Sequence, residues 1–257
     1  MLRDADPARR RFAAIVLPLD EYADEDRWDR VEDRLSDLNF VVGRLRVPDC
    51  ADFASSMRAP ATEARALSGC LFPGITLRRD AQDFLQHIPD RIRRTKDFRV
   101  NGLRYIDGYM GSDEDLRGLS ADFVSRTIHF PPGLSAQRHD SIQAMVMQPP
   151  GPQTGERTRY RKLWLGRILD LYKDSPTRIV FVEMPRAPVS RPESLQPPRF
   201  LRWALGRPRV SALPSGMFRD LERPELFFDG LHLNKIGRGI FTTRLAAQVS
   251  PLIGIGL

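Results

Sequence analysis

The sequence predicts an α/β fold, because two apolar runs of strand length stand between amphipathic helical patterns. Residues 12–19 read Phe-Ala-Ala-Ile-Val-Leu-Pro-Leu, and residues 179–182 read Ile-Val-Phe-Val. Continuous apolar runs without alternation are typical of parallel strands that are buried on both faces. We therefore expect a three-layer sandwich, in which helices cover both faces of a short parallel sheet.

The other elements follow from local patterns along the chain. Apolar residues at helical spacing predict helices at residues 28–38, 49–57, 61–67, 80–92, 158–173, 200–205 and 235–249. The second apolar run predicts a strand at residues 178–185, and a last short strand is expected at 209–213. Residues 98–156 are poorly periodic and rich in glycine and proline, so we expect an irregular excursion there. We treat residues 1–257 as a single domain.

The composition is that of a folded globular protein. Hydrophobic residues make up 41% of the 257 residues and charged residues 28%. No run approaches the roughly 18 apolar residues that a membrane span requires. The net charge is +7, but the arginines are spread along the chain, and no nucleic-acid motif accompanies them. We expect a solvated basic surface rather than a nucleic-acid site.

The cysteines and the N-terminus bear on the cellular compartment. Cys50 and Cys70 lack the CxxC spacing of a metal site, and we expect two buried free thiols, with one disulfide as the alternative. The first residues carry charge but no apolar core of signal-peptide length. The chain as it stands is expected in the cytoplasm. If an upstream segment is missing, an extracytoplasmic or membrane-anchored location is expected instead.

The residues that point to chemistry are Asp229 and His232. Of four histidines, only His232 has an aspartate three residues before it. In such a loop the carboxylate can accept the imidazole Nδ1–H, which fixes the tautomer and stabilises the imidazolium formed when Nε2 takes a proton. Gly230 gives the turn conformational freedom, and Asn234 is a predicted N-cap of the helix that follows. The alternative is a turn-forming aspartate beside a surface histidine.

The surroundings of this pair resemble a known family. Residues 229–237 read Asp-Gly-Leu-His-Leu-Asn-Lys-Ile-Gly, after Phe-Phe and before a terminal helix. This segment resembles the last sequence block of the SGNH/GDSL hydrolase superfamily, and the strand ending near Pro185 resembles its penultimate strand. The resemblance implies a flavodoxin-like parallel sheet. It also implies that His232 is the general base and then acid, that Asp229 orients it, and that no metal or organic cofactor is used.

Two departures from the family pattern concern the nucleophile and the oxyanion site. The family's serine block, Gly-Asp-Ser or Gly-x-Ser after the first strand, is not found. Residues 12–19 resemble instead the family's third block, which puts Asp20 at the position of an oxyanion donor, a poor role for a carboxylate. We expect a sheet that lacks its first strand and a serine supplied from upstream of Met1.

Substitutes for that serine are not evident in the sequence. None of the serines follows a buried strand in an elbow-like turn; those considered are Ser55, Ser56, Ser68, Ser120 and Ser215. Glu183 ends the predicted penultimate strand, and an ion pair with an arginine is expected for it.

Three functions remain open from the sequence. The first is SGNH-type ester hydrolysis or O-acyl transfer on an acylated small molecule, lipid or polysaccharide. The second is a non-catalytic SGNH-like domain that binds or supports other molecules. The third, an anion-binding basic protein, needs the arginines to gather on one face. An in-frame strand with Gly-x-Ser upstream of Met1 would favour the first over the second.

Overall fold

The computed structural model describes residues 2–19, 38–57, 60–101, 112–147, 159–190 and 199–254. The chain divides into two units. The helical unit contains Met1–Pro7, Asp24–Tyr105 and Pro152–Leu171, and the sheet unit contains Ala8–Ala23, Ile106–Gly151 and Tyr172–Leu257.

The sheet unit is built on three parallel strands, β1 (Ala14–Leu19), β4 (Arg178–Glu183) and β5 (Val210–Ala212), in the order β1-β4-β5. The apolar residues of β4 are all buried, as its unbroken apolar run predicts. β1 pairs with β4 in parallel, but its side chains from Ala14 to Leu17 are only half-buried. Its parallel pairing is therefore confirmed, and its burial only in part, because β1 is an edge strand among the strands that the structure describes.

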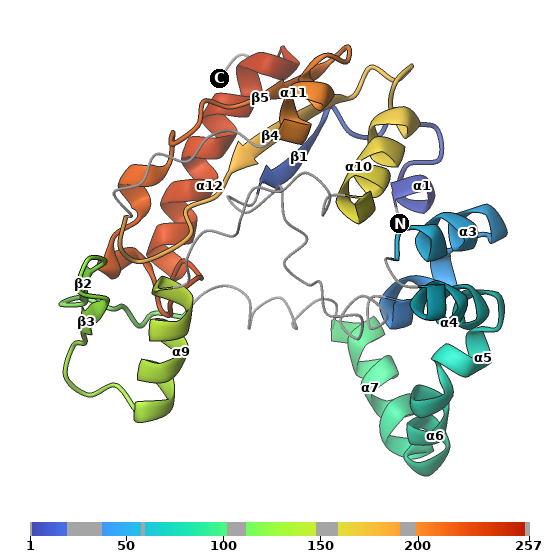
Figure 1. Cartoon of the computed structure of the whole chain (residues 1–257), viewed down its shortest axis with the longest axis horizontal. Coiled ribbons are helices and arrows are strands. Elements are labelled where there is room, and N and C mark those ends of the chain that lie inside the picture. The colour runs from blue at the N-terminus through green and yellow to red at the C-terminus, as the bar shows by residue number, and fades with distance from the viewer. Residues whose placement is uncertain are drawn as a thin grey trace. The chain divides into compact units, whose positions relative to one another are not determined.

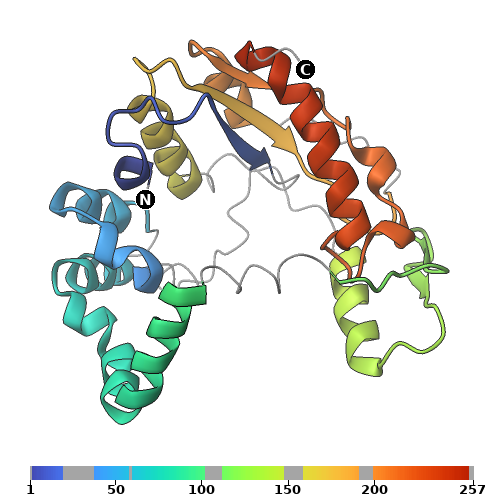
Figure 2. The same ribbon diagram turned by 180° about the vertical axis from the view of Figure 1, so that it is seen from behind.

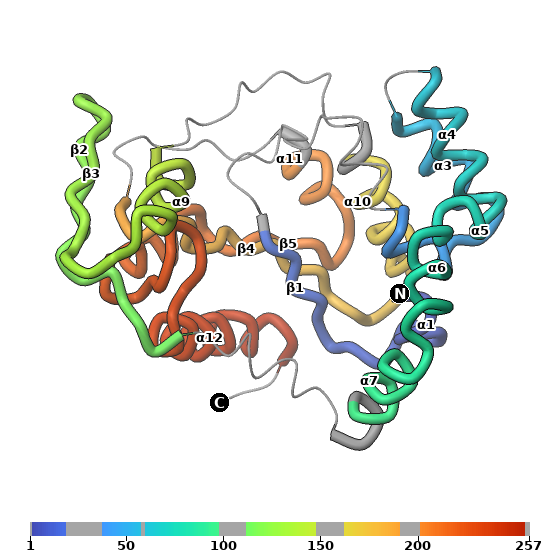
Figure 3. Tube along the Cα trace, turned by 90° about the horizontal axis from the view of Figure 1, so that it is seen from below, coloured from blue at the N-terminus to red at the C-terminus, as the bar shows by residue number. Residues whose placement is uncertain are grey.

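Helices lie on both faces of this sheet. α11 (Arg199–Leu205) and α12 (Lys235–Val249) flank it on opposite sides, as Figure 3 shows most clearly. Phe241 of α12 packs in one core with Val182 of β4 and with Phe227. The α/β expectation is confirmed at this level: a small three-stranded parallel sheet with helices packed on it.

The segment expected to be irregular contains ordered structure. β2 (Ser120–Asp122) and β3 (Thr127–His129) form an antiparallel hairpin, and α9 (Ala136–Val146) follows. Ile142 and Val146 of α9 are fully buried in the core of the sheet unit. The helix is too sparsely apolar for its period to stand out in sequence, and it is held by tertiary packing.

Residues 38–41 of the helical unit are helical, and its elements whose bounds are complete are coloured from blue to green and yellow in Figure 1. They are α1 (Leu2–Ala5), η1 (Val42–Arg44), α3 (Val47–Ser55), α4 (Pro60–Leu71), α5 (Pro73–Thr76), α6 (Arg78–Gln86), α7 (Ile88–Asn101) and α10 (Arg159–Leu171).

Four predicted helices can be compared with these elements. α3, α4 and α10 confirm the helices predicted at 49–57, 61–67 and 158–173. The helix predicted at 80–92 is divided at His87 into α6 and α7, because Pro89 has no N–H to continue the helical ladder. The pattern at 28–38 lies almost wholly outside the described residues.

A disulfide joins α3 to α4. Cys50 and Cys70 are bonded, with their Cα atoms 5.6 Å apart, so the expectation of free thiols is wrong. Both lie in the core of the helical unit beside Phe53 and Ala66. The packing of the two helices brings together residues that are 20 positions apart, which the spacing of two cysteines cannot reveal.

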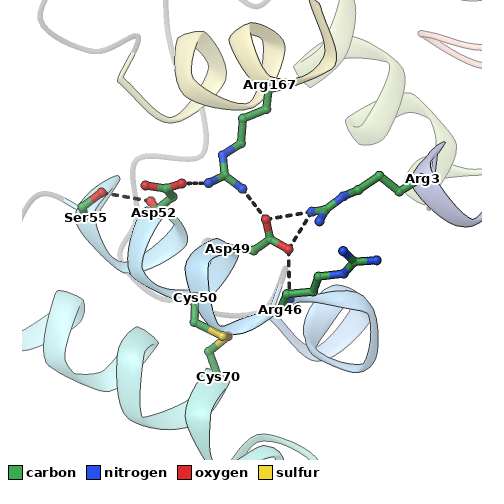
Figure 4. A network of polar contacts seen from close by, with 8 residues as sticks. All are labelled: Arg3, Arg46, Asp49, Cys50, Asp52, Ser55, Cys70 and Arg167. Atoms are coloured by element: carbon green, nitrogen blue, oxygen red, sulfur yellow. Dashed lines mark hydrogen bonds and ion pairs between the residues drawn. A yellow bond between two sulfur atoms is a disulfide. The ribbon is translucent and has the colours of Figure 1, made fainter. Parts of the chain in front are cut away.

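Next to the disulfide lies a buried carboxylate, Asp49 (Figure 4). It accepts hydrogen bonds from Arg3 at 2.6 and 2.7 Å, from Arg167 and from the backbone N–H of Arg46 at 2.9 Å. Arg167 also pairs with Asp52. Burial raises the pKa of Asp49, but these donors outweigh it and hold that pKa below its ordinary range.

None of the described helices is long and apolar enough to cross a membrane.

Candidate active site around Asp229 and His232

The predicted contact between the two motif residues is present. Asp229 Oδ2 lies 2.8 Å from His232 Nδ1. The other carboxylate oxygen, Oδ1, accepts the backbone N–H of Leu231 at 2.8 Å and that of His232 at 2.6 Å. An ionised carboxylate only accepts hydrogen bonds, so the imidazole proton belongs on Nδ1. In a neutral imidazole Nε2 then carries no proton and can accept a hydrogen bond.

The loop between them is fixed by close packing on α9. A Cβ atom at Gly230 would lie 2.8 Å from Cβ of Met145 and 3.2 Å from the carbonyl oxygen of Ile142. The backbone of Gly230 is not in the left-handed region. The glycine is therefore needed for close approach, and not for the turn freedom that the sequence suggests. Arg138 of α9 also donates to the carbonyl of Phe228, at 2.6 Å.

Asn234 anchors the loop to α12. Its side-chain oxygen accepts the N–H of Gly237 at 2.9 Å, which confirms the predicted N-cap. Its side-chain nitrogen donates to the carbonyl of Glu225 at 2.9 Å, and the residue is 1% exposed. Gly237 is also constrained, since a Cβ there would lie 2.4 Å from the carbonyl of Leu226.

The direction of the strands relates this loop to the sheet. In Figures 1 and 2 the arrows of β1 and β4 point toward the end of the sheet at which α12 begins, and the loop of Asp229 and His232 directly precedes α12. The carboxyl ends of parallel strands are where α/β proteins bind ligands. The His232 side chain is 56% exposed there and Asp229 27%.

Other sequence candidates are differently placed. Glu183, at the end of β4, accepts the Ser215 hydroxyl at 2.8 Å and the N–H of Gly216 at 2.7 Å, and among the described residues it has no ion pair with an arginine of the kind expected. The loop after β5 therefore passes close to the end of β4 and supplies both donors. Asp20 lies outside the described residues.

No serine of the described chain serves His232. Ser55, Ser56 and Ser68 donate to carbonyls three residues earlier in their own segments. Ser120 lies in β2, and the hydroxyl of Ser215 is bound to Glu183. Among the described residues, no hydroxyl or thiol is hydrogen-bonded to His232 Nε2.

A second exposed histidine–aspartate pair offers a comparison. In the helical unit, His87 Nδ1 lies 3.1 Å from Asp83 Oδ1, with side chains 55% and 52% exposed. That aspartate receives none of the backbone N–H bonds that hold Asp229. What distinguishes the Asp229–His232 pair is therefore its anchoring by the loop, α9 and α12, not the contact alone.

Sequence reasoning missed Arg138, Met145 and Ile142, which hold the loop from about 90 positions earlier in the chain. Within the parts of the chain that the structure describes, no group of three or more His, Cys, Asp or Glu side chains is arranged to hold a metal ion. Comparisons with protein-family models, curated proteins and solved structures find no match to this chain.

Proposed function

We propose that Asp229 and His232 are the acid–base pair of an SGNH-type site that hydrolyses or transfers acyl esters. The observation that carries the proposal is the 2.8 Å bond between Asp229 Oδ2 and His232 Nδ1, in a loop anchored to α9 and α12. It leaves Nε2 as the proton acceptor on a half-exposed imidazole.

The chemistry follows from that tautomer. Nε2 of His232 removes the proton of a nucleophilic hydroxyl as the hydroxyl oxygen bonds to the ester carbonyl carbon. The resulting imidazolium is stabilised by Asp229 and returns the proton to the departing alcohol oxygen. Water or an acceptor hydroxyl, activated by the same Nε2, then releases the acyl group. Water gives hydrolysis and an acceptor hydroxyl gives acyl transfer.

The finer architecture belongs to the same proposal. We propose a three-layer sandwich of flavodoxin-like strand order that is incomplete beside β1. The parallel order β1-β4-β5 supports it, as do the helices on both faces and the half-buried residues of β1. A strand that adds to the outer edge of β1 is where the proposal puts the serine.

The experiment measures hydrolysis of p-nitrophenyl acetate and butyrate by the product of the gene's full reading frame. His232→Ala should remove hydrolysis, and Asp229→Asn should lower kcat by about 10³–10⁴-fold, since the wrong tautomer is then favoured. His87→Ala is the matched control and should leave kcat unchanged. Equal rates in His232→Ala and the unchanged protein would rule the proposal out.

The second candidate is a non-catalytic SGNH-like domain. The absence of a hydroxyl at His232 Nε2 among the described residues favours it. In that case the full-length product hydrolyses no ester, while Asp229→Asn still weakens folding because two backbone N–H bonds lose an ionised acceptor.

A further inference from the structure

The segment from Phe72 to Asp97, which contains α5, α6 and most of α7, has no buried side chain. Every residue of it is exposed except Thr76, Leu77, Asp90 and Arg91, which are half-buried. α6 and α7 have nine and 14 residues, and isolated helices of this length are marginal in water. Figure 1 shows them extending away from α3 and α4 within the helical unit. We call this segment the arm.

The arm exposes large apolar side chains at helical spacing. Ala81, Phe84 and Leu85 share one face of α6, and Ile88 and Ile92 share one face of α7. Leu85 is 69% exposed and Ile92 45%. Phe72 and Ile75 of the preceding turn are similarly exposed. So large an apolar surface on consecutive helices is typical of a binding surface.

The arm also carries cations that pair with no carboxylate in the described parts of the chain. Three of its four aspartates are paired: Arg91 pairs with Asp80 and Asp83, and Arg93 pairs with Asp90 at 2.6 Å. Four cations of the arm have no carboxylate within ion-pair distance among the described residues; they are Arg78, Arg79, Arg94 and Lys96. The arm therefore combines an exposed apolar surface with an excess of positive charge, six arginines and lysines against four aspartates.

We propose that the arm binds the surface of an anionic lipid bilayer. Amphipathic helices with cationic flanks lie in the interface, with apolar side chains among the acyl chains and cations at the lipid phosphates. A nucleic acid would neutralise the cations but leave the aliphatic side chains in water. A second copy of the arm would set cations against cations. An anionic bilayer accounts for both the exposed apolar side chains and the cations, whereas a nucleic acid or a second copy accounts for only one of them.

The test is cosedimentation of the whole protein with vesicles of phosphatidylcholine alone and of phosphatidylcholine mixed with phosphatidylglycerol. Binding should need the anionic lipid and weaken with salt. Arg78→Gln with Arg79→Gln should weaken it about 25-fold, about fivefold for each cation. Leu85→Ser with Ile92→Ser should weaken it at least about tenfold. All four side chains are exposed, so the substitutions should leave the fold unchanged. Circular dichroism of each variant measures this.

Matched controls come from the sheet unit. Val124→Ser removes a side chain that is 96% exposed, and Arg126→Gln removes an exposed cation; neither should alter vesicle binding. In addition, tryptophan fluorescence of Leu85→Trp should shift to the blue on anionic vesicles, and that of Val124→Trp should not. Equal binding to neutral vesicles, or binding that survives both arm variants, would overturn the proposal. So would self-association in solution that Leu85→Ser with Ile92→Ser abolishes.

Discussion

Two glycines near the start of α12, two residues apart and so on opposite faces of the helix, stand in opposite environments. Gly237 lies against the loop before the helix, where an added Cβ would be 2.4 Å from the carbonyl of Leu226 and 3.0 Å from the side chain of Leu233. At Gly239 an added Cβ would meet nothing within 4 Å. The backbone contact at Gly237 cannot be relieved by a side-chain rotation, so the glycine sets how closely the candidate site's loop approaches its helix.

Gly237→Ala should therefore destabilise the sheet unit by more than about 2 kcal/mol, the scale of an overpacked core. Gly239→Ala, the matched control, should stabilise it by up to about 1 kcal/mol, because alanine favours the helix. Urea denaturation of the two variants measures the difference. Equal stabilities would mean that Leu226 does not approach α12 as closely as the structure has it.

The parts of the site that the sequence predicts are the local ones. The contact of Asp229 with His232, and the cap provided by Asn234, depend on residues within a few positions of each other. The packing of Gly230 on Met145 and the donation by Arg138 depend on α9, about 90 residues earlier. No local pattern shows which distant helix will pack on a loop. The donors that Glu183 meets, Ser215 and Gly216, also lie 32 and 33 positions away, beyond the reach of a local pattern.

At the scale of elements, the spacing of apolar residues predicts the helices and strands that are long or strongly patterned. α12 and β4 follow strong patterns, and they occupy the residues expected. α9 and the β2–β3 hairpin are short and depend on neighbours, so the sequence shows only glycine and proline there. The disulfide depends on the packing of α3 against α4. The elements that the sequence did not predict are those that tertiary contacts hold in place, more than the intrinsic preference of their residues.

Asp49 ties α3 to α1 and α10, and this junction should be sensitive to acid. Burial opposes its ionisation, but Arg46, Arg3 and Arg167 lower its pKa below 3.8 overall. A carboxyl with a lower pKa in the folded state stabilises the protein above its unfolded value, and this stabilisation is lost as the pH falls through the folded value. The helical unit should therefore lose stability below about pH 4.

Asp49→Asn should cost about 2 kcal/mol at neutral pH, since two guanidinium groups lose their ionised acceptor. It should also flatten the acid dependence. In a Trp203→Phe background the remaining tryptophans, Trp28 and Trp164, both belong to the helical unit, so their fluorescence reports its unfolding. Asp220→Asn, in the sheet unit, is the control. If Asp49→Asn leaves the loss of stability in acid unchanged, that loss comes from other carboxylates and not from Asp49.

At the scale of the whole molecule, the outer edge of β1 and the candidate site each lack a partner among the described residues. β1 is apolar and half-buried, and no described strand pairs with its outer side. An apolar strand edge invites pairing with another strand. His232 Nε2 has no hydroxyl partner among the described residues. A further strand that pairs with the outer side of β1 and carries a nucleophile would explain both observations.

Residues 1–257 by themselves should then hydrolyse no short acyl ester above the rate of His232→Ala. The reason is that general-base catalysis needs a nucleophile within hydrogen-bond reach of Nε2, about 3 Å. The measurement is p-nitrophenyl acetate hydrolysis, with labelling by a fluorophosphonate probe as a direct search for an activated serine. Ser215→Ala and Ser120→Ala test the two serines of the sheet unit considered as substitutes. Hydrolysis that His232→Ala and one serine variant both abolish would show that the nucleophile lies within these residues, and that β1 needs no further strand for the chemistry.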